Sequence, residues 1–289
     1  MMTPQQAHIL STRERRIAYR TKGHSQGPIT RLMSPGDLGQ LVKPFVFLDS
    51  FDFSSSGGDG GPVHPHSGIA THTTLLEGSL LYGDSTGKSG RLSSGSVEWM
   101  QAGGGVWHGG TPLRGQRLRG FQLWVALSPP LELAPAESHY VDQATIPGDG
   151  RVRVLLGAYL GMRSPIPYQS PVTYLHVRLR DGERWLYQAP ADHDVAWLAV
   201  TAGTLLVDAR PLRREMAVFE EGHAPIVCVA QGEVEFVIGS AAKHPHPLVT
   251  GYYSVHTSPE TLVLGEAGIE QVASTMTLKP GAPLSASLR

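Results

Sequence analysis

The chain has 289 residues, including 34 glycines and 22 prolines, and its 24 lysines and arginines nearly balance 25 aspartates and glutamates, for a formal net charge of -1. This length has room for two domains of ordinary size, and the abundant glycine and proline indicate many tight turns and few long helices. The balanced charge lacks the basic field that attracts nucleic acid, so direct binding of DNA or RNA is not expected.

The single cysteine, Cys228, excludes a disulfide within the chain and is typical of a reducing compartment. It lies in the apolar run 226–230, where we expect a buried and unreactive thiol. No segment reaches the ~20 apolar residues that span a bilayer, and residues 1–16 lack the apolar stretch of a signal peptide. We therefore expect a cytoplasmic protein that does not contact a membrane.

Short runs of β-branched and aromatic residues recur along the chain, separated by glycine, proline, serine and aspartate. This rhythm predicts antiparallel strands in a sandwich or barrel. The predicted strands are 45–48, 73–76, 97–100 and 121–125, with a hairpin turn at 83–90, and then 152–156, 173–179, 195–200 and 234–238. Residues 76–81 and 201–206 share an apolar run, a glycine and a second apolar run, which indicates two copies of one barrel.

The connection between the two copies is predicted from composition. Residues 128–145 begin with two prolines after the first residue and carry scattered polar side chains. We therefore predict an N-terminal barrel in residues 1–130, a linker in 131–148 and a C-terminal barrel in 149–289.

Three histidines carry the clearest chemistry. His64 and His66 are one residue apart on an extended segment, so their side chains point to the same face, and a barrel built from hairpins brings His108 back to them. Three imidazoles with open positions suit iron, zinc, copper, nickel or manganese. The chain has 13 histidines, however, and His244 and His246 form a second such pair that we interpret as a surface or interdomain feature. A set of three histidines that merely pack together is the alternative.

The surroundings of these histidines resemble the pirin family of the cupin superfamily. The first cupin motif is matched by HPHSG at 64–68 and LLEG at 75–78, and the second by GSVEWMQAGGGVWH at 95–108; KPFVFLD at 43–49 resembles the pirin segment before them. The second half of the chain is a looser match. The resemblance implies an all-β fold of two cupin barrels in tandem, each a double-stranded β-helix or jelly roll. It also implies one divalent transition metal, with iron expected, held by His64, His66 and His108.

Two departures from the pirin pattern remove negative charge from this site. The family has a glutamate ligand two residues after the third histidine, where this chain has Gly110, and a further glutamate where this chain has Ala70. Three neutral imidazoles leave the ion its full charge and should hold it less tightly. His72 is a replacement ligand only on an unbroken strand, whereas a bulge at 67–68 turns Thr71 to the metal instead.

Two polar residues are candidates for a place behind the ligands. Glu98 lies inside the second motif and Gln122 on the strand that follows it. A solvated or structural role is favoured for each. The second barrel lacks paired histidines at the matching position, so we expect it to be structural and metal-free.

The resemblance implies two alternative functions, and it leaves open whether the chain is an enzyme. One is a metal-dependent, quercetinase-type dioxygenase with a small aromatic substrate, since some pirins have this activity and three imidazoles leave positions for substrate and dioxygen; no catalytic side chain is identified. The other is a non-enzymatic, metal- or redox-sensitive partner of a transcription factor or metabolic enzyme, which the lost carboxylate favours. Pirins are often monomeric, and we expect a monomer.

Overall fold

The computed structural model describes residues 14–57, 60–168 and 170–277, which form two compact units. The first, here called the histidine barrel, consists of His24–Ile146 and the described residues from His244 on. The other, the second barrel, consists of Pro147–Lys243 and the described residues before His24. Residues 1–13, on which the expectation of no signal peptide rests, lie outside the described part. No described helix is long and apolar enough to cross a membrane.

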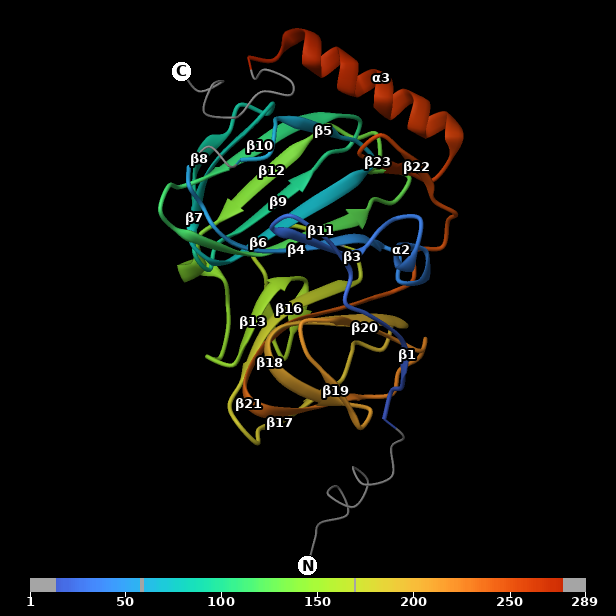
Figure 1. The fold of residues 1–289 in the computed structure, drawn as a ribbon. Helices are drawn as coiled ribbons and strands as arrows, with labels where there is room; N and C mark the ends of the chain where they lie inside the picture. The colour runs from blue at the N-terminus through green and yellow to red at the C-terminus, as the bar shows by residue number, and fades with distance from the viewer. Residues whose placement is uncertain (1–13, 58–59, 169, 278–289) are drawn as a thin grey trace, which may run out of the picture. The chain divides into compact units, whose positions relative to one another are not determined.

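The histidine barrel is built from two antiparallel sheets whose inner faces enclose its core (Figure 1). The seven-stranded sheet has the order β12-β9-β6-β11-β4-β3-β2, and the four-stranded sheet has the order β5-β10-β7-β8. The seven strands of the first sheet are β2 (His24–Gln26), β3 (Ile29–Met33), β4 (Phe45–Ser54), β6 (Ile69–Glu77), β9 (Val97–Gln101), β11 (Arg117–Ala126) and β12 (Glu137–Val141). Those of the second are β5 (His64–His66), β7 (Ser79–Asp84), β8 (Ser89–Ser93) and β10 (Val106–Pro112).

Four smaller elements complete this barrel. They are the short helices α2 (Leu38–Leu41) and η1 (Gln143–Thr145), the hairpin of β22 (Val249–Gly251) with β23 (Ser254–His256), and the helix α3 (Pro259–Thr275). The helix α3 was not predicted, although its start carries a sequence signal. Ser258 accepts a hydrogen bond from the Thr261 N–H, and Pro259 occupies the first turn. The helix packs on β10, where the Trp107 indole donates to the Ile269 carbonyl at 2.9 Å.

The second barrel contains an eight-stranded sheet and a small hairpin. The order is β1-β20-β18-β21-β16-β13, with β17 paired to β21 and β19 to β18. Alternate side chains of the two longest strands, β18 and β21, enter a single apolar core. The strands are β1 (Ile17–Thr21), β13 (Val152–Leu156), β14 (Ala158–Tyr159), β15 (Met162–Arg163), β16 (Val172–Leu179), β17 (Arg184–Tyr187), β18 (Val195–Val207), β19 (Arg210–Leu212), β20 (Met216–Phe219) and β21 (Ile226–Ala241).

The duplication suggested by the sequence corresponds to equivalent glycines in the two barrels. Gly78 joins β6 to β7 with φ 85°, and Gly203 interrupts the register of β18 with φ 77°. A Cβ at Gly78 would lie 2.3 Å from the Arg117 carbonyl oxygen, and a Cβ at Gly203 would lie 2.2 Å from that of Glu233. At both positions the backbone is left-handed and leaves no space for a Cβ, so both positions require glycine. The predicted all-β fold of two cupin barrels is confirmed, and each of the eight predicted strands lies within an observed strand.

The compact units differ from the domain boundaries expected from sequence, 1–130, 131–148 and 149–289. The segment expected as a linker contains β12, which pairs with β9 at the edge of the seven-stranded sheet. The chain after Lys243 returns to the histidine barrel, and β1 joins the second barrel by pairing with β20. Strand pairing between distant segments decides these memberships, and local composition does not report such pairing.

Candidate metal centre

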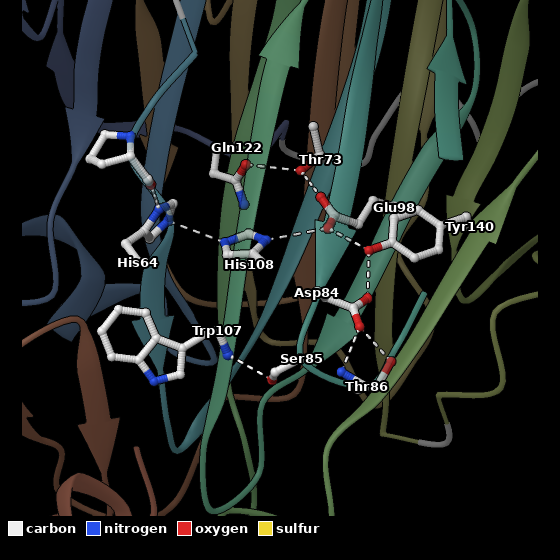
Figure 2. A network of polar contacts seen from close by, with 11 residues as sticks. His64, Thr73, Asp84, Ser85, Thr86, Glu98, Trp107, His108, Gln122 and Tyr140 are labelled. Carbon is white, nitrogen blue, oxygen red and sulfur yellow. Dashed lines mark hydrogen bonds and ion pairs between the residues drawn. The ribbon is translucent and has the colours of Figure 1, made fainter. Parts of the chain in front are cut away.

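His64, His66 and His108 come together because β5 and β10 are paired neighbours. In the register, His64 lies opposite His108 and His66 lies opposite Val106. Each histidine offers a ring nitrogen, and these three nitrogens lie within 4.8 Å of one another. The Nε2 atoms of His64 and His108 are 3.1 Å apart (Figure 2). The three histidines singled out in the sequence are thus positioned to bind a metal ion.

The outer nitrogen of each ring contacts an acceptor. Nδ1 of His64 lies 2.8 Å from the Pro62 carbonyl oxygen, and Nδ1 of His66 lies 2.9 Å from that of Tyr253. Nδ1 of His108 lies 3.4 Å from Oε1 of Glu98. Because a carbonyl or carboxylate only accepts, each Nδ1 carries the proton and donates it. Every Nε2 is therefore left with a lone pair, and all three lone pairs belong to the inward nitrogens.

Burial keeps the rings of His64 and His66 uncharged at neutral pH. Burial lowers the pKa of His64 to about 4, with a further contribution from neighbouring His108. Burial also lowers the pKa of His66 well below its usual range, and the two other histidines act in the same direction. A neutral imidazole is the form that binds metal, so little proton release accompanies binding at these two residues.

The spacing of the nitrogens fits a shared ion. Two nitrogens bound to one ion at about 2.1 Å each are about 3.0–3.4 Å apart for bond angles between 90° and 109°. The 3.1 Å between the Nε2 atoms of His64 and His108 lies in this range. In addition, Nε2 of His66 is buried and has no hydrogen-bond partner within the described part of the chain. A bound cation would satisfy the facing lone pairs of His64 and His108 and also the buried Nε2 of His66.

Behind His108, a chain of polar groups runs across the barrel interior (Figure 2). Glu98 accepts a hydrogen bond from the Thr73 hydroxyl and contacts the Tyr140 hydroxyl at 3.4 Å, while Tyr140 donates to Asp84 at 2.7 Å. Burial raises the pKa of Glu98, but the hydrogen bond and electrostatic interaction with His108, together with the contacts to Thr73 and Tyr140, outweigh it, so the pKa is lowered. Glu98 is therefore a buried carboxylate that contacts a candidate ligand. The solvated or structural role favoured from the sequence did not include this contact with His108.

Gln122 also belongs to this network. Its side-chain amide lies 2.9 Å from the Thr73 hydroxyl. Nε2 of the same amide is buried without a hydrogen-bond partner among the residues described, and Figure 2 shows it directed toward the side on which His108 lies. The amide can therefore form a hydrogen bond with a molecule bound beside the histidines.

The choice between Thr71 and His72 follows from the break between β5 and β6. Gly68 has φ 70° and interrupts the extended chain, so the alternation of side chains does not continue from His66 to His72. Thr71 pairs with Trp124, whose ring lies 4.9 Å from that of His66. His72 instead contacts the Thr74 hydroxyl at 3.1 Å and is not part of the cluster of candidate ligands.

Gly110 lies two residues after His108 on the regular strand β10, opposite Tyr82 of β7. A side chain there would point to the same face as that of His108. A Cβ would meet Leu80 Cδ1 at 3.5 Å, which is an ordinary contact. Among the described residues no carboxylate joins the three histidines.

An aromatic wall borders the histidines. The rings of Phe47 and Trp124 stack at 4.0 Å, and the ring of Tyr253 lies 5.3 Å from that of His64. Tyr253 is 38% exposed and occupies the tip of the β22–β23 hairpin with φ 55°, a conformation that is strained for a tyrosine. Sequence reasoning missed Tyr253, because it lies 187 residues after His66, beyond the reach of any local pattern.

The second histidine pair is divided between interior and surface. His244 is buried, and its Nε2 lies 3.2 Å from the Leu127 carbonyl oxygen, whereas His246 is exposed. Of the expected surface or interdomain location, a surface position describes His246, whereas His244 lies in the interior.

Two cupin barrels, with three histidines in one of them positioned to bind a metal, define a bicupin of the metal-binding class. The sequence profile described as Pirin matches residues 28–125. A pirin-like protein of Caulobacter vibrioides is 31% identical over 222 residues, which cover 71% of this chain and 76% of that protein. A Pseudomonas aeruginosa protein, provisionally named a quercetin 2,3-dioxygenase, is 30% identical over 243 residues, or 78% of this chain and 84% of the relative. The chain belongs to the pirin family.

Solved structures agree with this fold. A quercetin 2,3-dioxygenase from Acinetobacter baumannii superposes with a TM-score of 0.82 at 22% identity, covering 91% of this chain and 99% of the other. A bacterial pirin from Escherichia coli, solved in complex with nickel(II), superposes with a TM-score of 0.62 at 17% identity, covering 80% and 98%. At these identities the likeness concerns the fold.

Proposed function

We propose that this pirin-type bicupin binds one iron(II) ion through the Nε2 atoms of His64, His66 and His108 and acts as a dioxygenase on a small aromatic substrate of the flavonol class. A divalent transition metal fits the three-histidine site, and iron is the finer proposal. The names of the relatives support the substrate class. No catalytic side chain is assigned.

The observation that carries the proposal is that the Nδ1 atom of each of the three histidines contacts a hydrogen-bond acceptor. Pro62, Tyr253 and Glu98 each accept from one Nδ1, which leaves a lone pair on every Nε2. The three rings form one cluster, with one nitrogen of each within 4.8 Å of the others. Histidines that merely pack together have no reason to share this orientation. In metalloproteins, hydrogen bonds from the nitrogen that does not bind the metal orient the histidine ligands.

A bound ferrous ion supplies redox chemistry and open coordination positions for dioxygen and a chelating substrate. The chain's own residues supply the surroundings. The Gln122 amide offers a hydrogen bond, and Trp124 and Tyr253 offer apolar faces to an aromatic ring. Because no described carboxylate faces the inward nitrogens, we propose that the substrate binds with its hydroxyl already ionised.

Elemental analysis tests the metal site first. Wild-type protein purified without chelator and reconstituted anaerobically with iron(II) should hold about one equivalent. A His64→Ala/His108→Ala variant should hold almost none. His246→Ala removes an exposed histidine of the second pair and serves as the matched control. Equal metal contents in the wild type and the double variant would refute the site.

Oxygen consumption with iron-loaded protein and quercetin then tests the reaction. We expect turnover above that of free iron(II) at the same concentration, and loss of this turnover in the double variant. Turnover no faster than that of free metal would refute the dioxygenase proposal and leave the metal site standing.

The absence of a carboxylate at Gly110 favours a second candidate function, that of a metal- or redox-sensitive interaction protein. In that case affinity purification should recover a partner, either a transcription factor or a metabolic enzyme, whose amount differs between iron(II)- and iron(III)-loaded protein. The His64→Ala/His108→Ala variant should abolish the difference. Identical recovery in both oxidation states would exclude this function.

A further inference from the structure

The three groups that accept hydrogen bonds from the Nδ1 atoms of the histidines differ in charge. His64 and His66 donate to the backbone carbonyls of Pro62 and Tyr253, which are neutral. His108 instead faces the carboxylate of Glu98 at 3.4 Å, and both side chains are only 8% exposed. Glu98 therefore places a buried negative charge one imidazole away from the inward nitrogens.

Proton counting shows that His108 is the donor on which Glu98 Oε1 depends. The Tyr140 hydroxyl has one proton, and it lies 2.7 Å from Asp84 but 3.4 Å from Glu98. Its proton therefore goes to Asp84. Thr73 donates to the other oxygen of Glu98. The remaining donor at Oε1 is Nδ1–H of His108, which holds that ring in the tautomer with Nε2 free (Figure 2).

A carboxylate hydrogen-bonded to the far side of a ligating imidazole makes that imidazole a stronger donor to the metal. This contribution matters more here than in a site with its own carboxylate ligand, because Gly110 has no side chain to coordinate. Three neutral rings leave both positive charges of the ion uncompensated. Among the described residues, Glu98 is the carboxylate that contacts one of these rings, that of His108.

We propose that Glu98 is a positioning residue for the metal: its carboxylate, acting through His108, supplies the negative charge that Gly110 cannot. The inference rests on the proposed metal site. It assigns to Glu98 a role in metal affinity, separate from any contact with substrate.

Cobalt(II) is a suitable probe, because its visible spectrum reports the ligand field and its affinity can be measured by competition with a chelating dye. Glu98→Gln keeps the size of the side chain and removes its charge. Asp84→Asn is the matched control. Asp84 is buried like Glu98 and also accepts from Tyr140, and although its backbone pairs with that of His108, its carboxylate forms no hydrogen bond or ion pair with a candidate ligand in the described structure. The melting temperature of each metal-free variant separates effects on folding from effects on the metal.

We expect Glu98→Gln to weaken cobalt binding by about 10- to 100-fold and to shift the cobalt spectrum. Asp84→Asn should leave both the affinity and the spectrum nearly unchanged. Unchanged affinity in Glu98→Gln, or equal losses in both variants, would overturn the role of Glu98. Wild-type protein that binds no cobalt would instead refute the metal site itself. Should Glu98→Gln not fold, Glu98→Asp withdraws the carboxylate by one methylene and should show the same loss; full affinity in that variant would also overturn the proposal.

Discussion

The substitution Gly110→Glu should tighten metal binding while destabilising the metal-free protein. The position is suited to the test, because β10 is regular and the new side chain would point to the face of His108. A Cβ there has only ordinary contact with Leu80, at 3.5 Å. Gly110 is not among the glycines with positive φ, so its backbone conformation does not oppose a side chain.

The magnitude follows from two opposing effects on the metal-free state. A half-buried carboxylate without a partner costs about 1–3 kcal/mol. Replacing a glycine within a strand recovers about 0.5–1 kcal/mol of chain entropy. The metal-free variant should therefore be less stable by up to about 2.5 kcal/mol, which lowers the melting temperature by several degrees.

The metal-bound state should show the reverse. A direct carboxylate ligand should tighten the dissociation constant by at least the ~10- to 100-fold that outer contacts contribute, or about 1.4–2.7 kcal/mol. Competition with a chelating dye measures this gain in affinity. Thermal melting with and without chelator tests whether Gly110→Glu lowers the melting temperature of the metal-free protein and raises that of the metal-bound protein. Gly110→Gln, with the same size and no charge, is the control.

Equal tightening by Gly110→Gln and Gly110→Glu would show that charge is not what the site lacks. No tightening in either variant would show that position 110 does not reach the metal. A double variant with Glu98→Gln adds a further check. If both carboxylates compensate the same ion, the loss caused by Glu98→Gln should shrink when Gly110→Glu is present.

Three other predictions concern residues outside the ligand set. Burial raises the pKa of the Cys228 thiol, so a thiol reagent should leave the native protein unmodified at pH 8 and modify one thiol per chain in denaturant; full reaction under native conditions would refute its burial. Gly265→Ala places a Cβ 2.4 Å from Nε2 of His256. The protein should be destabilised, because overpacking costs about 1–3 kcal/mol and the higher helix propensity of alanine recovers only about 1 kcal/mol; an unchanged or higher melting temperature would contradict this packing. Tyr253→Gly removes the ring but keeps the carbonyl that accepts from His66, so the KM for an aromatic substrate should rise while metal content stays constant; a loss of metal would show that the ring itself supports the site.

The sequence by itself determined the class of fold and the three histidines of the candidate site. Alternation and turn residues are local properties, and the eight strands they predict lie within observed strands. His64 and His66 share a face because they are two residues apart on an extended chain. Gly110 needs no structure at all to show that a ligand is missing, because glycine has no side chain.

Only the tertiary structure decided what surrounds those donors. Glu98 and Tyr253 contact His108 and His66 from separations of 10 and 187 residues. The return of the chain after Lys243 to the histidine barrel is decided in the same way. Such contacts depend on which strands pair and in what register, and the free energy of that pairing comes from many residues at once. No pattern within one segment encodes it. The sequence therefore shows which residues can bind a metal, whereas the fold decides which ring nitrogens face the site and what charge surrounds them.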